Sequence, residues 1–151
     1  MHLHLEKHIQ GAGHVDLTEE GKTAKGMADT IISKGLPDLS EIWGSEVVLF
    51  YPGLYAGQTD LVGTYDYEDS IIDFKSSNKM KRKEWIEDYF LQLGAYAMAH
   101  NQVYGTEITQ GVILMCTPEM QFQKFQIKGQ KFIEYQHQFL AKVDQYYKMF
   151  K

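Results

Sequence analysis

The segment that most constrains the fold of this chain is residues 70–77, with the sequence SIIDFKSS. Its isoleucines and phenylalanine favour burial in a β-strand, whereas Asp73 and Lys75 are costly to bury unless they are paired or bound to a metal ion. Side chains alternate between the two faces of a strand, so this aspartate and this lysine share one face. The pair predicts either a salt bridge at a sheet edge or a functional site. The apolar residues around it favour the site.

Apolar spacing along the rest of the chain predicts blocks of helix and strand. Alternating or fully apolar short runs indicate strands, and recurrence every three to four residues indicates helices. Because several strands are apolar on both faces, we expect helices on both sides of one mixed sheet, an α/β (α+β) fold. Asp16 is the expected N-cap of the second helix. The expected helices are residues 2–10, 16–36, 85–103 and 132–150, and the expected strands are residues 45–51, 58–65, 70–75, 111–118 and 121–127.

Composition limits the classes of function. A length of 151 residues fits a single domain, residues 1–151. Cys116 is the only cysteine, which excludes an internal disulfide, a Cys-rich zinc site and a four-thiolate iron–sulfur cluster, and we expect it to be buried. No apolar run suits a membrane span and no secretory leader opens the sequence, so the expected location is the cytoplasm, with no membrane partner. The net charge of −5 disfavours a general nucleic-acid surface, although residues 75–83 hold five cations.

The strand at residues 58–65 and the strand at residues 70–75 are predicted to form a hairpin. If Tyr65 pairs with Ser70, Asp60 lies opposite Lys75 and shares the face of Asp73. A slip of one residue would move Asp60 to the other face. Two carboxylates at such spacing suit Mg²⁺ or Mn²⁺, which prefer oxygen ligands, and a neighbouring lysine can reach a substrate bound to the metal. These residues therefore indicate phosphodiester chemistry.

Further motifs stand in the order found in a known family. Residues 2–9 (HLHLEKHI) match a helical His-x-x-Leu-Glu-x-x-apolar pattern, and residues 57–60 match a glycine–(Thr)–Asp turn. Residues 73–76 match an Asp-(Phe/Trp)-Lys-(Ser/Thr) strand, and residues 92–96 match a helical Gln-x-x-x-Tyr motif. Over residues 2–127 the chain thus resembles the PD-(D/E)xK nuclease superfamily, and more narrowly its RecB-like exonucleases of phages and of mitochondrial genome maintenance. The sequence lacks the Arg-Gly-Thr and the helices that usually precede the histidine, so it resembles a trimmed or minimal member.

The resemblance implies a restriction-endonuclease-like fold and a Mg²⁺- or Mn²⁺-dependent DNA exonuclease acting in repair, recombination or phage genome processing. It further implies that the DNA offers a single-stranded or free end. The implied metal ligands are Asp60, Asp73, the Phe74 carbonyl and His2, and Lys75 would position the attacking water and stabilise the phosphate. The other implied residues are Glu46, for a metal-bound water, Gln92 and Tyr96, for Lys75 or the DNA backbone, and the DNA contacts Ser76, Ser77, Lys79, Lys81 and Arg82.

Two alternatives stay open. A structure-selective endonuclease of the same fold would share every catalytic residue, and the Gln-x-x-x-Tyr motif favours the exonuclease. A non-catalytic nucleic-acid-binding domain could keep the fold, but the complete set of Asp60, Asp73 and Lys75 argues against it. His4 and His8 have the spacing of a metal pair on a helix, but without further histidine or cysteine ligands we expect them to face solvent.

Overall fold

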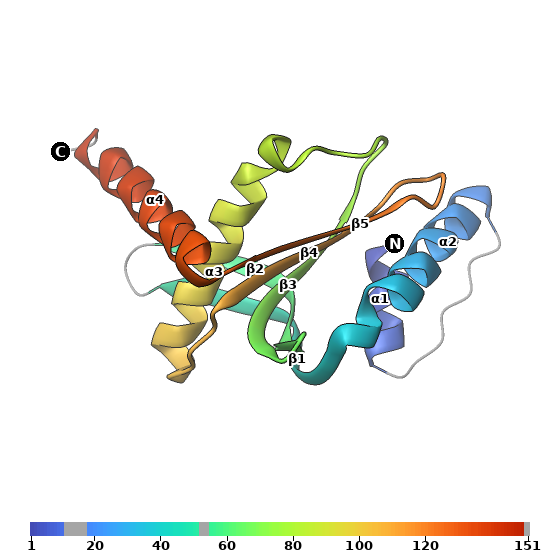
Figure 1. Ribbon diagram of the computed structural model, residues 1–151, viewed down its shortest axis with the longest axis horizontal. Helices are drawn as coiled ribbons and strands as arrows, with labels where there is room; N and C mark the ends of the chain where they lie inside the picture. The colour runs from blue at the N-terminus through green and yellow to red at the C-terminus, as the bar shows by residue number, and fades with distance from the viewer. Residues whose placement is uncertain (11–17, 52–54, 150–151) are drawn as a thin grey trace.

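The computed structural model describes residues 1–10, 18–51 and 55–149. Figure 1 shows a twisted sheet between two groups of helices, which confirms the α/β class and the expected order of helices and strands. The elements are α1 (His2–Ile9), α2 (Glu19–Lys34), η1 (Leu36–Asp38), β1 (Leu39–Tyr51), β2 (Tyr55–Tyr65), β3 (Glu68–Ser76), η2 (Lys83–Trp85), α3 (Glu87–Tyr104), β4 (Gln110–Cys116), β5 (Phe122–Lys128) and α4 (Gly129–Lys148).

Within the described residues the strands form one five-stranded sheet in the order β1-β2-β3-β4-β5. All neighbours are antiparallel except β3 and β4, which are parallel. Parallel neighbours cannot be joined by a tight turn, so the chain crosses from β3 to β4 through α3. Every residue of β4 is buried, as expected for a strand with neighbours on both sides and helices on both faces.

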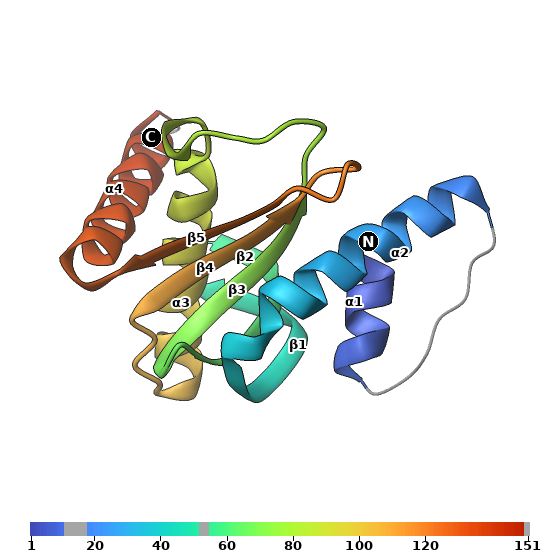
Figure 2. The same ribbon diagram turned by 45° about the vertical axis from the view of Figure 1, so that its right-hand side comes forward.

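Helices α3 and α4 lie on one face of the sheet and α1 and α2 on the other (Figure 2), and each pair covers an apolar core. On one face α3 and α4 pack over β3 and β4, with Phe90 and Ile71 fully buried between them. On the other face α1 and α2 cover the same strands, and Leu5 of α1 belongs to the same core as Ile72. The adjacent residues Ile71 and Ile72 enter opposite cores because side chains alternate along a strand. Cys116 is buried in the second core, as expected.

Several element boundaries differ from the predictions, and β2 (from Tyr55), β3 (Glu68–Ser76) and α4 (from Gly129) each begin two or three residues earlier than predicted. β1 begins at Leu39 rather than at residue 45, because register shifts against β2 interrupt the alternating pattern in its first half. The N-cap of α2 is Thr18, whose hydroxyl accepts the Gly21 N–H; the predicted cap, Asp16, lies outside the described residues. Trp85 belongs to η2, and α3 begins two residues later at Glu87.

The β2–β3 hairpin has a tighter turn than predicted. Tyr65 pairs with Glu68, not with Ser70, because Asp66 and Tyr67 have φ values of 49° and 65° and form a two-residue turn. The predicted register was therefore wrong by two residues, but an even shift leaves Asp60 on the predicted face. Backbone pairing of β2 with β3 ends at Leu61 and Ile72, whereas β3 stays paired with β4 as far as Ser76.

Candidate active site

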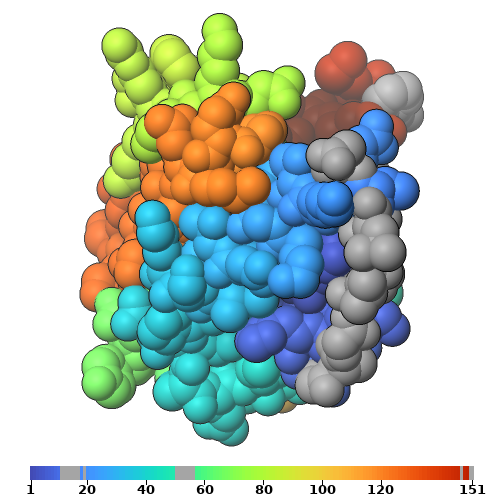
Figure 3. All heavy atoms as spheres, turned by 90° about the vertical axis from the view of Figure 1, so that its right-hand side faces the viewer, coloured from blue at the N-terminus to red at the C-terminus, as the bar shows by residue number. Residues whose placement is uncertain are grey.

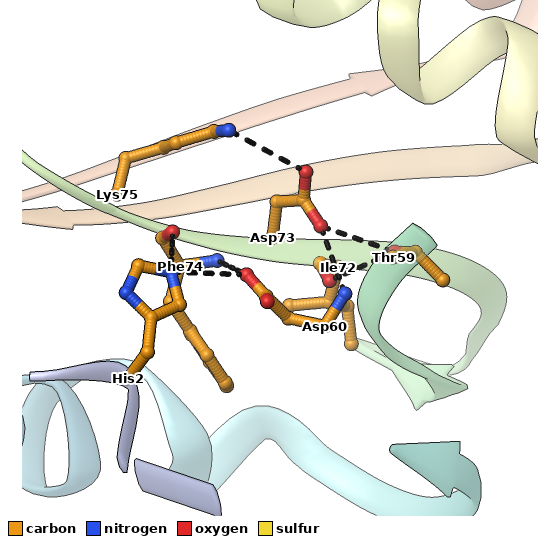
Figure 4. A network of polar contacts seen from close by, with 7 residues as sticks. All are labelled: His2, Thr59, Asp60, Ile72, Asp73, Phe74 and Lys75. Atoms are coloured by element: carbon orange, nitrogen blue, oxygen red, sulfur yellow. Dashed lines mark hydrogen bonds and ion pairs between the residues drawn. The ribbon is translucent and has the colours of Figure 1, made fainter. Parts of the chain in front are cut away.

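Two aspartates occupy the point where the β2–β3 ladder ends (Figure 4). The Asp60 carboxylate Oδ2 accepts the backbone N–H of Phe74 at 2.8 Å. The Asp73 carboxylate Oδ1 accepts the backbone N–H of Asp60 at 3.1 Å and the hydroxyl of Thr59 at 3.1 Å. Each side chain thus bonds to the backbone of the opposite strand and replaces a ladder hydrogen bond. The structure brings the two predicted carboxylates together.

Lys75 lies beside this pair. Its Nζ is 3.7 Å from Asp73 Oδ2 and 4.7 Å from the centre of the Tyr89 ring, which α3 supplies. The Lys75 side chain is only 26% exposed, so the ammonium group is held between a carboxylate and an aromatic face rather than in bulk solvent. The predicted cluster of Asp60, Asp73 and Lys75 is therefore present in the structure.

His2 reaches the site from α1, on the other side of the sheet (Figure 4). Its Nε2 is 2.6 Å from the Phe74 carbonyl oxygen and 3.3 Å from Asp60 Oδ2. The hydrogen bond with Asp60 raises the pKa of His2, against the opposing effect of burial. Three predicted ligand atoms, from α1, β2 and β3, consequently converge on one place.

The electrostatics of this place suit a cation. Burial, and then the charge of Asp60, raise the pKa of Asp73 to about 6, although Asp60 N–H, Lys75 and Thr59 act in the other direction. Among the described residues no group of three or more His, Cys, Asp or Glu side chains is spaced to hold a metal ion. The donors present are carboxylates, one carbonyl and one imidazole. This mainly oxygen set fits Mg²⁺ or Mn²⁺, which keep several waters and need few protein ligands.

Glu46 borders the same site from β1. It has the left-handed backbone φ of 49° and stands opposite Asp60, between the pairs formed by Ser45 and by Val47 with β2. Its exposed carboxyl contacts Glu6 of α1, and this hydrogen bond is the main cause that raises the pKa of Glu46. Glu46, Glu6, His2 and Asp60 line one small cavity. A strained residue beside a cluster of acids is typical of a functional site rather than of a plain strand.

Gln92 and Tyr96 lie behind the carboxylates, on α3. The Tyr96 hydroxyl contacts the backbone of Gln58 and the side chain of Gln92, and burial followed by the charge of Asp73 raises the pKa of Tyr96. A Cβ on Gly57 would lie 2.5 Å from Cε1 of Tyr96, so only glycine allows this approach. The predicted glycine–Thr–Asp turn is in fact part of strand β2. These side chains therefore hold β2 in place, and the contact to Lys75 comes from Tyr89 instead.

The predicted DNA contacts run from Ser76, the last residue of β3, to Arg82, just before η2. Ser76, Lys79 and Arg82 are exposed, and Lys81 is half-buried. The hydroxyl of Ser77 donates to the Lys79 carbonyl, so it serves the local turn. None of the contacts described for these residues reaches the carboxylates of Asp60 and Asp73.

The sequence analysis did not predict three residues that contact the predicted site residues. Thr59 holds Asp73, Glu6 contacts Glu46, and Tyr89 covers Lys75. Tyr89 had a usable signal, because it precedes Gln92 by one helical turn on the same side of α3. His4 and His8 were both expected to face solvent. His8 is exposed, as expected, whereas His4 is half-buried.

No family model matches this chain, and no curated protein matches it. Among solved structures it is similar to a candidate exonuclease from Eubacterium rectale, with a TM-score of 0.60 and 15% identity over 95% of this chain and 62% of that one. An alkaline exonuclease from Laribacter hongkongensis aligns with a TM-score of 0.36 and 12% identity over 97% of this chain and 78% of that one, too low to support an argument. The chain thus shares the fold of the first protein and spans 62% of its length. None of the described helices is both long and apolar enough to cross a membrane.

Proposed function

We propose that this chain is a metal-dependent DNA exonuclease that hydrolyses phosphodiester bonds. The observation that carries the proposal is the meeting of Asp60, Asp73 and Lys75 where the β2–β3 ladder ends. Two carboxylates and a lysine held on one strand pair can bind a divalent cation and a phosphate at the same place. The fold shared with the candidate exonuclease from Eubacterium rectale is compatible with this activity.

Mg²⁺ or Mn²⁺ would be held by Asp60, Asp73, the Phe74 carbonyl and His2. When bound, the ion lowers the pKa of a coordinated water and offsets charge on the phosphate oxygens. Both hydrogen bonds of Asp73 are accepted by Oδ1, so Oδ2 keeps lone pairs with which it could ligate the ion.

Other residues of the site would stabilise charge, orient the attacking water and hold the metal ligands in place. Lys75 places a positive charge beside Asp73, where it stabilises the additional negative charge on the phosphate and orients the attacking water. Tyr89 restrains the lysine, since its ring covers Nζ. Glu46 faces Asp60 from β1 and can accept a hydrogen bond from a water at the site. Tyr96 and Gln92 hold the β2 segment that carries Asp60.

The test is digestion of end-labelled linear DNA and of closed circular DNA, with Mg²⁺ or with EDTA. We expect Mg²⁺-dependent release of nucleotides from linear DNA only, and loss of this activity in Asp73→Asn. Lys75→Ala should lose the activity as well. Its matched control is Lys128→Ala, because Lys128 is a lysine on the same sheet that pairs with Glu68 at the other end of the hairpin.

Other results of the digestion assay would support a different function. Cutting of circles would replace the exonuclease by an endonuclease of the same fold. DNA binding without cleavage in either metal would indicate a non-catalytic binding domain. The rates of digestion of blunt, recessed and overhanging ends would be compared. The preferred end structure would then distinguish a role in repair, in recombination or in phage genome processing.

A further inference from the structure

The segment between β3 and α3 carries a cationic cluster that the proposed chemistry does not use. Lys79, Lys81, Arg82 and Lys83 stand in a chain of net charge −5, and Glu84 is the only acid among residues 79–85. In the part of the chain that the structure describes, none of these four cations forms an ion pair with a carboxylate. Figure 3 shows the yellow-green side chains of this segment projecting beyond the neighbouring surface. Uncompensated positive charge of this density suits a polyanion.

The segment is held in a defined shape. The side-chain amide of Gln123, on β5, accepts the Lys81 N–H at 2.8 Å and donates to the Lys81 carbonyl at 2.7 Å. Farther along, Ile86 is 2% exposed and anchors the end of the segment in the core under α3. Arg82 and Trp85 lie between these two anchors, joined by the hydrogen bond from Trp85 N–H to the Arg82 carbonyl.

Trp85 presents an aromatic surface beside those cations. Its side chain is 61% exposed, and the Arg82 guanidinium lies 5.3 Å from its ring centre. An indole left in water next to a guanidinium is a ready stacking partner for a nucleobase, because any base offers a flat face to such a pair. Trp85 precedes Tyr89, the residue whose ring covers Lys75, by four positions. The surface is therefore carried by the segment that leads directly into α3, the helix that supplies Tyr89 to the proposed catalytic cluster.

We propose that Trp85 and Arg82 form a stacking subsite for an unpaired nucleobase, with Lys79, Lys81 and Lys83 contacting the phosphates of the same strand. Inside a duplex the neighbouring bases cover both faces of each base, so only a single-stranded or frayed end offers a free face to the indole. The inference rests on the proposed function, since it assigns a single-stranded end as the DNA that this site receives.

The experiment measures binding without cleavage. In a Trp43→Phe background Trp85 is the only tryptophan, because the chain has two. A single-stranded thymidine 12-mer is added in EDTA, and the quenching of indole fluorescence is followed. We expect strong quenching, with little quenching by a blunt duplex of the same length. Anisotropy of a labelled strand shows when the protein is saturated with single-stranded DNA. If the indole fluorescence is not quenched at saturation, the proposal is overturned.

Variants distinguish stacking from a structural effect. Trp85→Ala should weaken binding of the single strand about tenfold or more, and Trp85→Phe should restore most of it. Removing the bases from the oligonucleotide should weaken wild-type binding by a similar factor but leave Trp85→Ala binding unchanged. If removal of the bases weakens binding equally in wild type and in Trp85→Ala, the proposal is overturned. Tyr67→Asn, at the 93% exposed aromatic of the hairpin turn, is the control and should bind like wild type.

Failure of this inference differs from failure of the proposed function. If wild-type protein degrades linear DNA but ignores the loss of bases, the subsite is wrong and the nuclease stands. If the fluorescence and base-removal results hold but no DNA is cleaved with any divalent metal, the subsite stands and the nuclease is wrong.

Discussion

The two ends of the β2–β3 hairpin satisfy their polar groups in different ways. At the turn end the backbone ladder is complete, and the buried Gln110 side chain donates to the Tyr65 carbonyl and to the Ser70 hydroxyl. It also accepts from Gln126, which donates to the Asp66 carboxylate as well. At the other end the ladder stops, and the carboxylates of Asp60 and Asp73 take its place.

The difference separates stability from activity. The buried polar side chains at the turn end, Ser70 and Gln110, are neutral and paired with each other, so they stabilise the folded state and hold no charge for a ligand. The charges at that end, such as the ion pair of Glu68 with Lys128, lie nearer the surface. At the carboxylate end, burial of Asp73 and then the nearby charge of Asp60 raise the pKa of Asp73 to about 6. Such an arrangement costs stability until a cation arrives. Function is therefore expected to depend on one end of the hairpin and stability on the other.

The largest expected effect is loss of cleavage at the carboxylate end. Asp73→Ala and Lys75→Ala should each reduce kcat/KM on linear DNA by about a thousandfold or more, because charge stabilisation at the phosphate is lost. Circular dichroism should show an unchanged fold. Near wild-type kcat/KM in both variants would place the catalytic site elsewhere.

The next effect concerns pH and stability at the same residue. The folded-state pKa of Asp73, about 6, lies above the ordinary value of 3.8, so folding favours its protonated form. The stability of the metal-free protein should therefore fall as pH rises from about 4 to about 6, by about 2–3 kcal/mol. Asp73→Asn stays neutral, so in EDTA it should be more stable than wild type above pH 6 and equally stable near pH 4. Urea unfolding at several pH values measures this; an Asn variant less stable at pH 7 would contradict it.

At the turn end the expected change is in stability alone. Gln110 is fully buried, and Gln110→Ala leaves the Tyr65 carbonyl and the Ser70 hydroxyl without their partner. The free energy of unfolding should drop by about 1–3 kcal/mol, with kcat of the folded fraction unchanged. Denaturant titration and DNA digestion on the same preparation test both parts. A large loss of kcat in a folded Gln110→Ala protein would break the division between the two ends.

A smaller effect is expected for the aromatic face over Lys75. Tyr89→Leu should lower kcat about tenfold because the lysine is less restrained, with KM little changed, whereas Tyr89→Phe keeps the ring and most of the rate. Equal losses in the leucine and phenylalanine variants would assign the effect to the hydroxyl instead of the ring.

The smallest expected effect is at His2. Its side chain is half exposed, and Mg²⁺ prefers oxygen to nitrogen, so His2→Ala should weaken Mg²⁺ affinity by roughly tenfold or less. Isothermal titration with Mg²⁺ in the absence of DNA measures this directly. His8→Ala, an exposed histidine of the same helix, is the control. Unchanged affinity in His2→Ala would remove His2 from the ligand set.

Local pattern was sufficient for the order of elements and for the shared face of Asp73 and Lys75. Helical and strand periodicities depend on neighbours in sequence, so they survive without knowledge of the fold. The shared face of Asp60 was predicted through a register that was wrong by two residues, and it held only because the error was even. The turn was tighter because Asp66 and Tyr67 both adopt positive φ. A tyrosine rarely adopts positive φ, so the sequence did not predict this turn.

Contacts between distant segments were decided by the tertiary structure. His2 meets Phe74 and Asp60 because α1 packs on one face of the sheet, and Tyr89 meets Lys75 because α3 packs on the other. Both helices can reach the site since the β2–β3 ladder ends there. The sequence by itself determined which residues carry charge and on which side of their own strand they lie. How far two strands stay paired, and which helix covers which face, depends on packing across the whole core, and no short stretch of sequence contains that information.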